Sequence, residues 1–225
     1  MRILCVALCF GLFACAKSES NKSERAPTKP KLVVKAESKP AATDTGIKSP
    51  APLAGSELIG KSAPAWQFVE WANSKPITLA QLKGRVVLVR FWTNGCPFCV
   101  KSLPAMQQLA DEFRGKPVTI IGAYHSKPFK SERPWKQAVD TANKWGVKFP
   151  LAYDRQWKTV FGWWLKGHKR KATSASFVID AEGKFAHVHA GPVFYPSEKA
   201  YDKQENEDFI QIRRAIKSAL AKAKS

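Results

Sequence analysis

Apart from an apolar run at 3–13, hydrophobic residues are concentrated after about residue 55, where they follow two kinds of spacing. Mainly apolar runs at 86–91 and 118–123, rich in β-branched residues, predict buried strands. Between these runs, large apolar side chains recur at helical spacing over 97–113. The pattern therefore predicts a strand, a short turn and a helix as the central unit of the fold.

The rest of this region continues the alternation of strands and helices. Further patterns predict helices at 134–145, 157–161 and 208–223, strands at 66–69, 76–79 and 149–153, and a hairpin of strands at 176–180 and 185–189. We expect 66–69 and 76–79 to pair as an N-terminal β-hairpin. Such an order predicts an α/β fold, with helices on both faces of one sheet, in a single domain over 56–225.

The first residues have the pattern of a targeting segment. Arg2 supplies a positive charge, and the apolar run at 3–13 is too short to span a bilayer as a helix. The run closes with Leu12-Phe13-Ala14-Cys15, which is similar to a bacterial lipoprotein cleavage site. We predict a signal peptide at 1–14 and lipidation of Cys15; an ordinary signal peptide or an uncleaved anchor remains an alternative. All three place the folded region outside the cytoplasm.

Composition changes sharply after the targeting segment. Residues 15–55 are rich in Lys, Ser, Pro, Ala and Thr and show no periodicity, which predicts a disordered tether between lipid and domain. Of the five cysteines, Cys5 and Cys9 fall in the predicted signal and Cys15 would carry lipid. Only Cys96 and Cys99 then remain as thiols of the folded region, in a compartment where disulfides persist.

Cys96-Pro97-Phe98-Cys99 lies at the predicted strand-to-helix turn. A helix N-terminus carries unpaired N–H groups and a partial positive charge, which stabilise a thiolate there. Pro97 suits the first helical position, where no N–H donor is needed. We predict that Cys96 is the nucleophile and that Cys99, one turn deeper, resolves the mixed disulfide. A zinc site would need a second ligand pair that the sequence does not supply, so no metal is expected.

The ordered set of motifs resembles the thioredoxin fold, and more closely the envelope-anchored thiol–disulfide oxidoreductases of the TlpA/ResA type and the thioredoxin-like domain of DipZ-type proteins. The resemblance covers about 60–220. Its carriers are Gly60-Lys61-x-Ala63-Pro64, Phe91-Trp92, Cys96-Pro97-Phe98-Cys99, Pro104, Phe177-Val178-Ile179-Asp180-x-x-Gly183-Lys184 and Gly191.

The resemblance implies a thioredoxin-like fold with a central mixed sheet, and exchange of disulfides with other envelope proteins. It implies that the Cys96–Cys99 disulfide is the only redox group, with no cofactor, and that a membrane partner supplies electrons. It favours the reductase direction and a monomer. Trp92, Pro97 and Phe98 are expected to support the active site.

The chain departs from this family at three positions. Ser174, preceded by Thr173, stands where relatives place a cis-proline facing the disulfide, and we expect a trans bond there. Arg90 replaces a buried acid beneath the active site; we expect it to turn outward, because an unpaired buried arginine is costly. Gly95 replaces the tryptophan that commonly precedes the nucleophile.

Three histidines carry further hypotheses. His125 ends the second predicted strand at the sheet edge of Cys96, where it is either a proton shuttle or an exposed loop residue. His187 and His189 share one face of a strand and either seed a metal site or face solvent, and we favour solvent. The alternative functions are a thiol peroxidase, because Thr93-x-x-Cys96 matches half of a peroxiredoxin signature, and a non-enzymatic copper-binding or chaperone module using both thiols.

The net charge of +19 is spread along the chain and is densest at 166–171. No nucleic-acid recognition motif accompanies it, so nucleic acid is not an expected partner. Anionic lipid, acidic partners or simple solvation account for a basic surface of this kind. Beside it stand Trp163 and Trp164, and we expect one of this pair to line a substrate groove.

Overall fold

The computed structural model describes residues 53–170 and 172–224. The predicted signal segment at 1–14, the lipidation site Cys15 and nearly all of the tether at 15–55 lie outside the described residues. None of the described helices has both the length and the apolar character needed to cross a bilayer.

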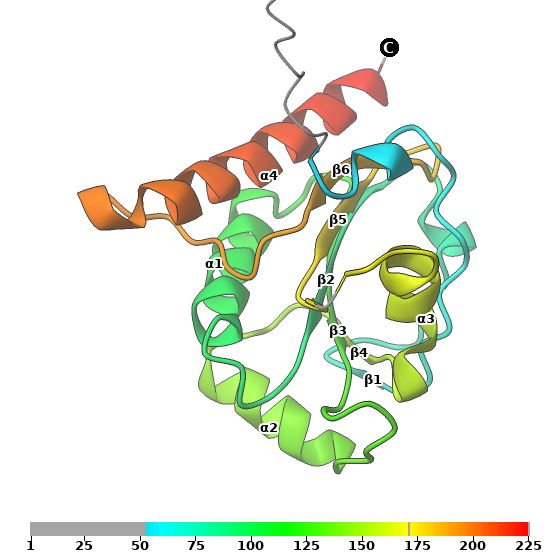
Figure 1. The fold of residues 1–225 in the computed structure, drawn as a ribbon. Helices are drawn as coiled ribbons and strands as arrows, with labels where there is room; N and C mark the ends of the chain where they lie inside the picture. The colour runs from blue at the N-terminus through cyan, green and yellow to red at the C-terminus, as the bar shows by residue number, and fades with distance from the viewer. Residues whose placement is uncertain (1–52, 171, 225) are drawn as a thin grey trace, which may run out of the picture. The chain divides into compact units, whose positions relative to one another are not determined.

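A single mixed sheet of six strands, in the order β1-β4-β3-β2-β5-β6, forms the centre of the fold (Figure 1). The strands are β1 (Trp71–Ala72), β2 (Val86–Trp92), β3 (Val118–Tyr124), β4 (Leu151–Tyr153), β5 (Ser176–Ile179) and β6 (Phe185–His189). Strands β2, β3 and β4 run parallel, whereas β1, β5 and β6 pair antiparallel with their neighbours. Every residue of β2 is buried, as a central strand covered on both faces requires.

Helices cover both faces of this sheet (Figure 1). The helices are α1 (Cys99–Glu112), α2 (Trp135–Lys144), α3 (Lys158–Val160) and α4 (Lys203–Lys222), with shorter helical turns η1 (Ser56–Leu58), η2 (Ala80–Leu82), η3 (Arg155–Trp157), η4 (Phe161–Leu165) and η5 (Ala200–Asp202). Helices α1, α2 and α4 contribute to one core, in which Leu103, Met106 and Ile212 are fully buried. Burying each of these side chains stabilises the fold by about 1.5–3 kcal/mol.

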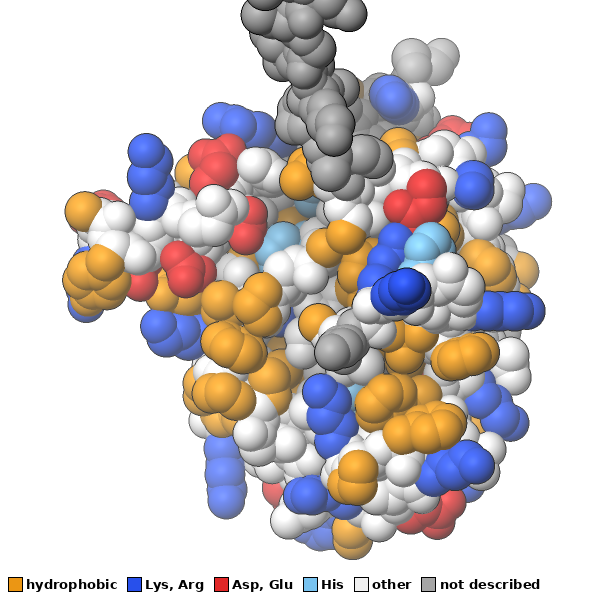
Figure 2. Space-filling view, in the orientation of Figure 1, with side chains coloured by type: hydrophobic (Ala, Val, Ile, Leu, Met, Phe, Trp, Pro, Cys, Tyr) orange, Lys and Arg blue, Asp and Glu red, His pale blue; other side chains and the backbone are white. Residues whose placement is uncertain are grey.

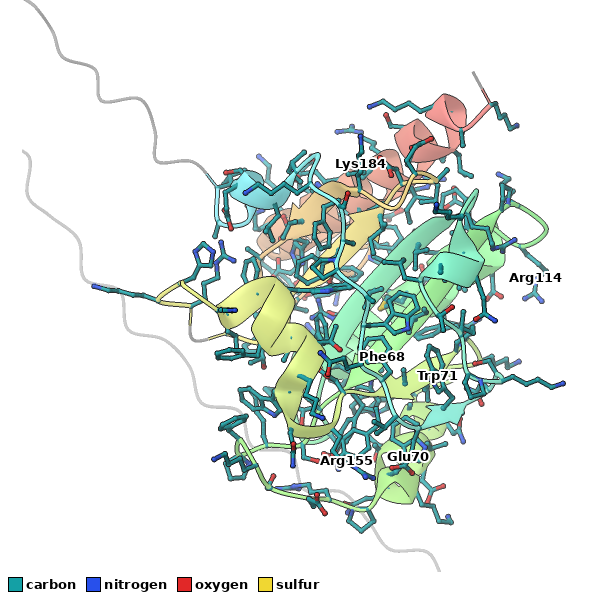
Figure 3. The ribbon with its side chains drawn as sticks, turned by 90° about the vertical axis from the view of Figure 1, so that its right-hand side faces the viewer. Phe68, Glu70, Trp71, Arg114, Arg155 and Lys184 are labelled. Carbon is teal, nitrogen blue, oxygen red and sulfur yellow. The ribbon has the colours of Figure 1, made fainter. Side chains whose placement is uncertain are left out.

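A second core lies on the opposite face, between the sheet, α3, η4 and the segment at 63–79. Its aromatic rings pack edge to face: the ring centroids of Phe68 and Trp71 lie 5.9 Å apart, and those of Phe91 and Trp163 lie 6.0 Å apart. Figure 3 shows this side, with Phe68 and Trp71 beside the sheet. Glu70 lies next to Arg155 in the same view and pairs with it at 2.7 Å. The segment at 63–79 is thus part of the core of the domain.

The structure confirms the predicted α/β, thioredoxin-like architecture but not the N-terminal hairpin. Only β1 forms in this segment, and it pairs with β4. The backbone N–H of Val69 donates to the carbonyl of Tyr153, so the segment extends the edge of the main sheet instead of pairing with 76–79. The alternation at 66–69 therefore reflects aromatic packing on the sheet face. Helix α4 also begins five residues earlier than the pattern predicts.

Candidate active site

Cys96 and Cys99 lie where β2 ends and α1 begins, as the sequence predicts. Strand β2 ends at Trp92, and α1 begins at Cys99. Between them Gly95 has a φ of +75°, a conformation that a side chain rarely adopts, so glycine allows the turn. Cys96 is half-buried and Cys99 is fully buried, and both are free thiols. The turn therefore presents one thiol to solvent and holds the other beneath it.

Hydrogen bonds separate the chemistry of the two thiols. The Cys96 sulfur accepts the backbone N–H of Cys99 at 3.3 Å. Hydrogen bonding from the Cys99 thiol is the main cause that lowers the pKa of Cys96 to about 5, with backbone N–H groups at the helix start and Ser174 adding to it. That same hydrogen bond, together with burial, raises the pKa of Cys99. Cys96 is therefore ionised at neutral pH, and Cys99 keeps its proton.

A cavity of about 450 Å³ lies beside Cys96. Most of its lining is apolar, and its residues are Thr93, Asn94, Gly95, Cys96, Pro97, Phe98, Lys127, Arg133, Ala172, Thr173, Ser174 and Pro192. The predicted residues Pro97, Phe98, Thr173 and Ser174 thus meet at this groove. Among the described residues the only cis peptide bond precedes Pro128, so the bond before Ser174 is trans, as expected.

Five residues of this groove were not singled out from the sequence, namely Asn94, Lys127, Arg133, Ala172 and Pro192. Asn94 lies within the motif, and its side-chain oxygen accepts the Tyr124 hydroxyl at 3.0 Å. Lys127, Arg133 and Pro192 come from loops far from the motif in sequence. Of these residues, only Asn94 could have been predicted from the sequence, because it lies beside Cys96 in the motif. The others are brought to the groove by tertiary folding alone.

Arg90 does not turn outward, and that expectation is wrong. Its side chain is fully buried, with no carboxylate in ion-pair distance among the described residues. Two carbonyl groups, a hydroxyl and an aromatic ring replace the missing anion. The polar groups around the site thus accommodate a charge that was expected at the surface.

His125 is buried as well, so the expectation of an exposed loop residue is wrong. Both ring nitrogens lack a hydrogen-bond partner in the described region, and the ring lies 4.8 Å from that of Trp157. Burial lowers the pKa of His125 to about 3, so the ring is neutral at physiological pH. The ring does not line the groove at Cys96. Trp92 also lies in the core, where it packs against Tyr124.

The two histidines of β6 differ in their burial and contacts. His189 is buried, contrary to the expectation of solvent exposure, and pairs with Asp208 at 3.1 Å. His187 is partly buried. The described part of the chain contains no cluster of three or more His, Cys, Asp or Glu side chains suited to a metal ion.

The tryptophan pair and Arg170, one residue of the basic run, serve packing. Trp163 and Trp164 are both buried, so the expectation that one lines a groove is wrong; η4 turns both rings into the second core. The guanidinium of Arg170 stacks 3.8 Å from the Trp164 ring and pairs with Glu57. Figure 2 shows Lys and Arg side chains distributed over the visible face, with acidic side chains among them.

Comparisons with known proteins agree with this geometry. The Redoxin family model matches residues 58–204. The thiol-disulfide oxidoreductase ResA of Bacillus subtilis is 31% identical over 141 residues, which are 62% of this chain and 72% of ResA. The protein DipZ of Mycobacterium tuberculosis is 28% identical over 139 residues, which cover 60% of this chain but only 19% of DipZ. The chain thus spans about a fifth of DipZ.

Solved structures share the fold. A thiol:disulfide interchange protein of the thioredoxin family from Chlorobium tepidum superposes with a TM-score of 0.53 at 22% identity, over 71% of this chain and 95% of that one. A thioredoxin-like superfamily protein gives a TM-score of 0.55 at 20% identity, over 71% and 96% of the two chains. At these identities the likeness establishes the thioredoxin-like fold.

Proposed function

The chain belongs to the redoxin family, and we propose that it is a thiol–disulfide oxidoreductase that reduces disulfides of exported proteins. One observation carries this proposal: an ionised, half-exposed Cys96 lies above a buried, protonated Cys99 in a groove. The names of the ResA relatives support the same class of reaction.

The reaction has two steps. The Cys96 thiolate attacks a substrate disulfide, which forms a mixed disulfide and releases one substrate thiolate. Cys99 then loses its proton and attacks the Cys96 sulfur, so that the Cys96–Cys99 bond forms and the second substrate thiolate leaves. The substrate gains two electrons and the protein pair loses two. No cofactor other than this dithiol is required.

The proposed setting is the bacterial envelope. Lipidation of Cys15 would hold the domain at a membrane, where a membrane partner supplies the electrons that reduce the Cys96–Cys99 disulfide. The domain acts as a monomer on disulfide-bearing envelope proteins. The predicted targeting segment supports this location, because it directs the domain out of the cytoplasm.

The reduction potential of the pair tests the direction of exchange. The full chain, with Cys5, Cys9 and Cys15 replaced by serine, is equilibrated against dithiothreitol or glutathione. A reductase is expected near or below about −270 mV, whereas a value towards about −120 mV would indicate a disulfide donor. Failure to form any Cys96–Cys99 disulfide would overturn the proposal.

A trapping experiment tests the separate roles of the thiols. Cys99→Ser is expected to accumulate a mixed disulfide with a disulfide-bearing protein, because the resolving thiol is absent. Cys96→Ser is the matched control, and it should trap nothing because Cys99 is inaccessible to a substrate. Turnover of hydrogen peroxide at a comparable rate would favour the peroxidase alternative, and stoichiometric copper(I) binding that blocks both thiols would favour the metal-binding one.

A further inference from the structure

A positive charge lies inside the domain, and no acidic side chain of the described residues pairs with it. The Arg90 side chain is fully buried, and this burial lowers its pKa. Its guanidinium donates to the carbonyl oxygen of Pro192 at 2.6 Å, to that of Ser174 at 3.4 Å and to the Ser176 hydroxyl at 2.8 Å. It also lies 4.9 Å from the Phe194 ring. These partners are dipoles, so they solvate the charge without neutralising it.

The position of Arg90 brings this charge beneath the dithiol. Side chains alternate between the two faces of a strand, so Arg90 shares a face of β2 with Leu88 and Trp92. Both of these neighbours belong to the core that contains Cys99. The guanidinium therefore lies under the first turn of α1, where its charge lowers the pKa of Cys99 against the effect of burial.

The partners of Arg90 also connect it to the groove. Ser174 and Pro192 both line the cavity beside Cys96, and they come from segments on either side of the β5–β6 hairpin. The guanidinium holds a carbonyl of each segment. One buried side chain thus joins the groove lining to the strand that carries the active-site turn.

We propose that Arg90 is a positioning residue of the exchange reaction, which holds the Ser174 and Pro192 segments beside Cys96 and stabilises the thiolate of Cys99 in the resolving step. This inference rests on the proposed function. In that step Cys99 gives up its proton, which the departing substrate thiolate takes up. The Cys96–Cys99 bond forms as the bond between Cys96 and the substrate breaks. Arg90 remains charged throughout and transfers no proton.

The charge also favours the reduced protein over the oxidised one. Only the reduced dithiol carries a thiolate, and an opposite charge stabilises it most strongly in an interior of low dielectric constant. The disulfide is neutral and gains nothing comparable from the guanidinium. Removing the charge is therefore expected to shift the pair towards the disulfide and to make the protein a stronger reductant.

The test compares Arg90→Met, which has a neutral side chain of similar length, with Arg90→Lys, which retains the charge. Both are made in the full chain with Cys5, Cys9 and Cys15 replaced by serine. In Arg90→Met the equilibrium against glutathione is expected to shift at least about tenfold towards the disulfide, which corresponds to about 30 mV for a two-electron couple. A quenched time course should show its mixed disulfide persisting longer. Arg90→Lys should remain closer to the parent in both measurements.

Arg85→Met is the matched control, because Arg85 precedes the opposite end of β2 and bonds Thr119 and the Val118 carbonyl. Its potential should equal that of the parent. An equal shift in Arg85→Met and Arg90→Met would overturn the inference. So would an unchanged potential and mixed-disulfide lifetime in Arg90→Met.

A further variant serves if Arg90→Met does not fold. Ser176→Ala keeps the charge but removes the hydroxyl that holds it, and it should prolong the mixed disulfide about threefold, as the loss of one hydrogen bond predicts. No change in Ser176→Ala would then overturn the inference.

If the parent chain forms no disulfide at any glutathione ratio, the proposed function fails and this inference fails with it. If the parent titrates normally and the variants match it, the inference alone is wrong.

Discussion

The buried ring of His125 makes the stability of the domain depend on pH. The ring is inaccessible to solvent, and within the described region neither nitrogen has a partner. Burial, with a smaller contribution from the charge of Lys127, lowers its pKa from 6.5 to about 3. A protonated ring is therefore incompatible with the folded interior but not with the unfolded chain.

The sign and size of the effect follow from this difference in pKa. Between its folded and unfolded pKa values the unfolded chain binds more protons at this site, so lowering the pH favours unfolding. The contribution is fully present above the unfolded value of 6.5 and is lost as the pH falls towards the folded value of about 3. One pKa unit is worth about 1.4 kcal/mol, so about 3 kcal/mol is lost between about pH 7.5 and about pH 4.5.

Urea unfolding of the parent and His125→Phe at these two pH values measures this contribution. The phenylalanine ring retains contact with Trp157 but takes up no proton. The parent should lose about 3 kcal/mol more than the variant on acidification. Asp154 opposes the trend, because its pKa is raised to about 6 by burial, but it is present in both proteins and cancels from the comparison.

Phe161→Leu provides the control, since Phe161 is exposed and the variant retains His125. It should lose stability in parallel with the parent. If His125→Phe also falls in parallel with the parent, the buried neutral ring does not account for the acid sensitivity and the reasoning is refuted.

Two further predictions concern the site and the core. The pKa of Cys96 can be measured from the pH profile of its alkylation by iodoacetamide. Cys99→Ala should raise this pKa by at least about one unit and Ser174→Ala by less, because the Cys99 thiol donates the more important hydrogen bond. Equal pH profiles for the two variants would contradict this order. Gly122→Ala should lower the free energy of unfolding in urea by about 1–3 kcal/mol, because a Cβ would lie 3.0 Å from a Leu151 methyl group. At Gly162 an added Cβ would meet no described atom within 4 Å beyond its chain neighbours and its own helix, so Gly162→Ala should be neutral or stabilising. Equal losses in the two variants would contradict the observed packing.

Local patterns predicted the elements that depend on neighbouring residues. The buried runs became β2 and β3, and the alternating segments became the β5–β6 hairpin. The turn carrying Cys96 formed as expected, because a strand, a glycine-containing turn and an amphipathic helix are all specified within about thirty residues. The same patterns misassigned 66–69, where alternation came from aromatic rings packing on a sheet formed by distant strands.

The burial of individual side chains could not be predicted from local patterns in the same way. Because burying an unpaired charge is costly, the sequence favoured an outward-facing Arg90. The sequence did not reveal that carbonyls from Ser174 and Pro192, more than eighty residues away, would converge on its guanidinium. His125 and the tryptophan pair were misjudged for the same reason, since their exposure depends on which segments cover them.

Contiguous spacing in the sequence was enough to predict the family, the α/β order of elements and the two thiols that are proposed to react. Tertiary structure alone decided the groove, the buried charge beneath it and the neutral state of His125. Those properties arise from segments that are distant along the chain and meet only after folding, when low-dielectric surroundings and converging backbone dipoles set the charge that each group carries.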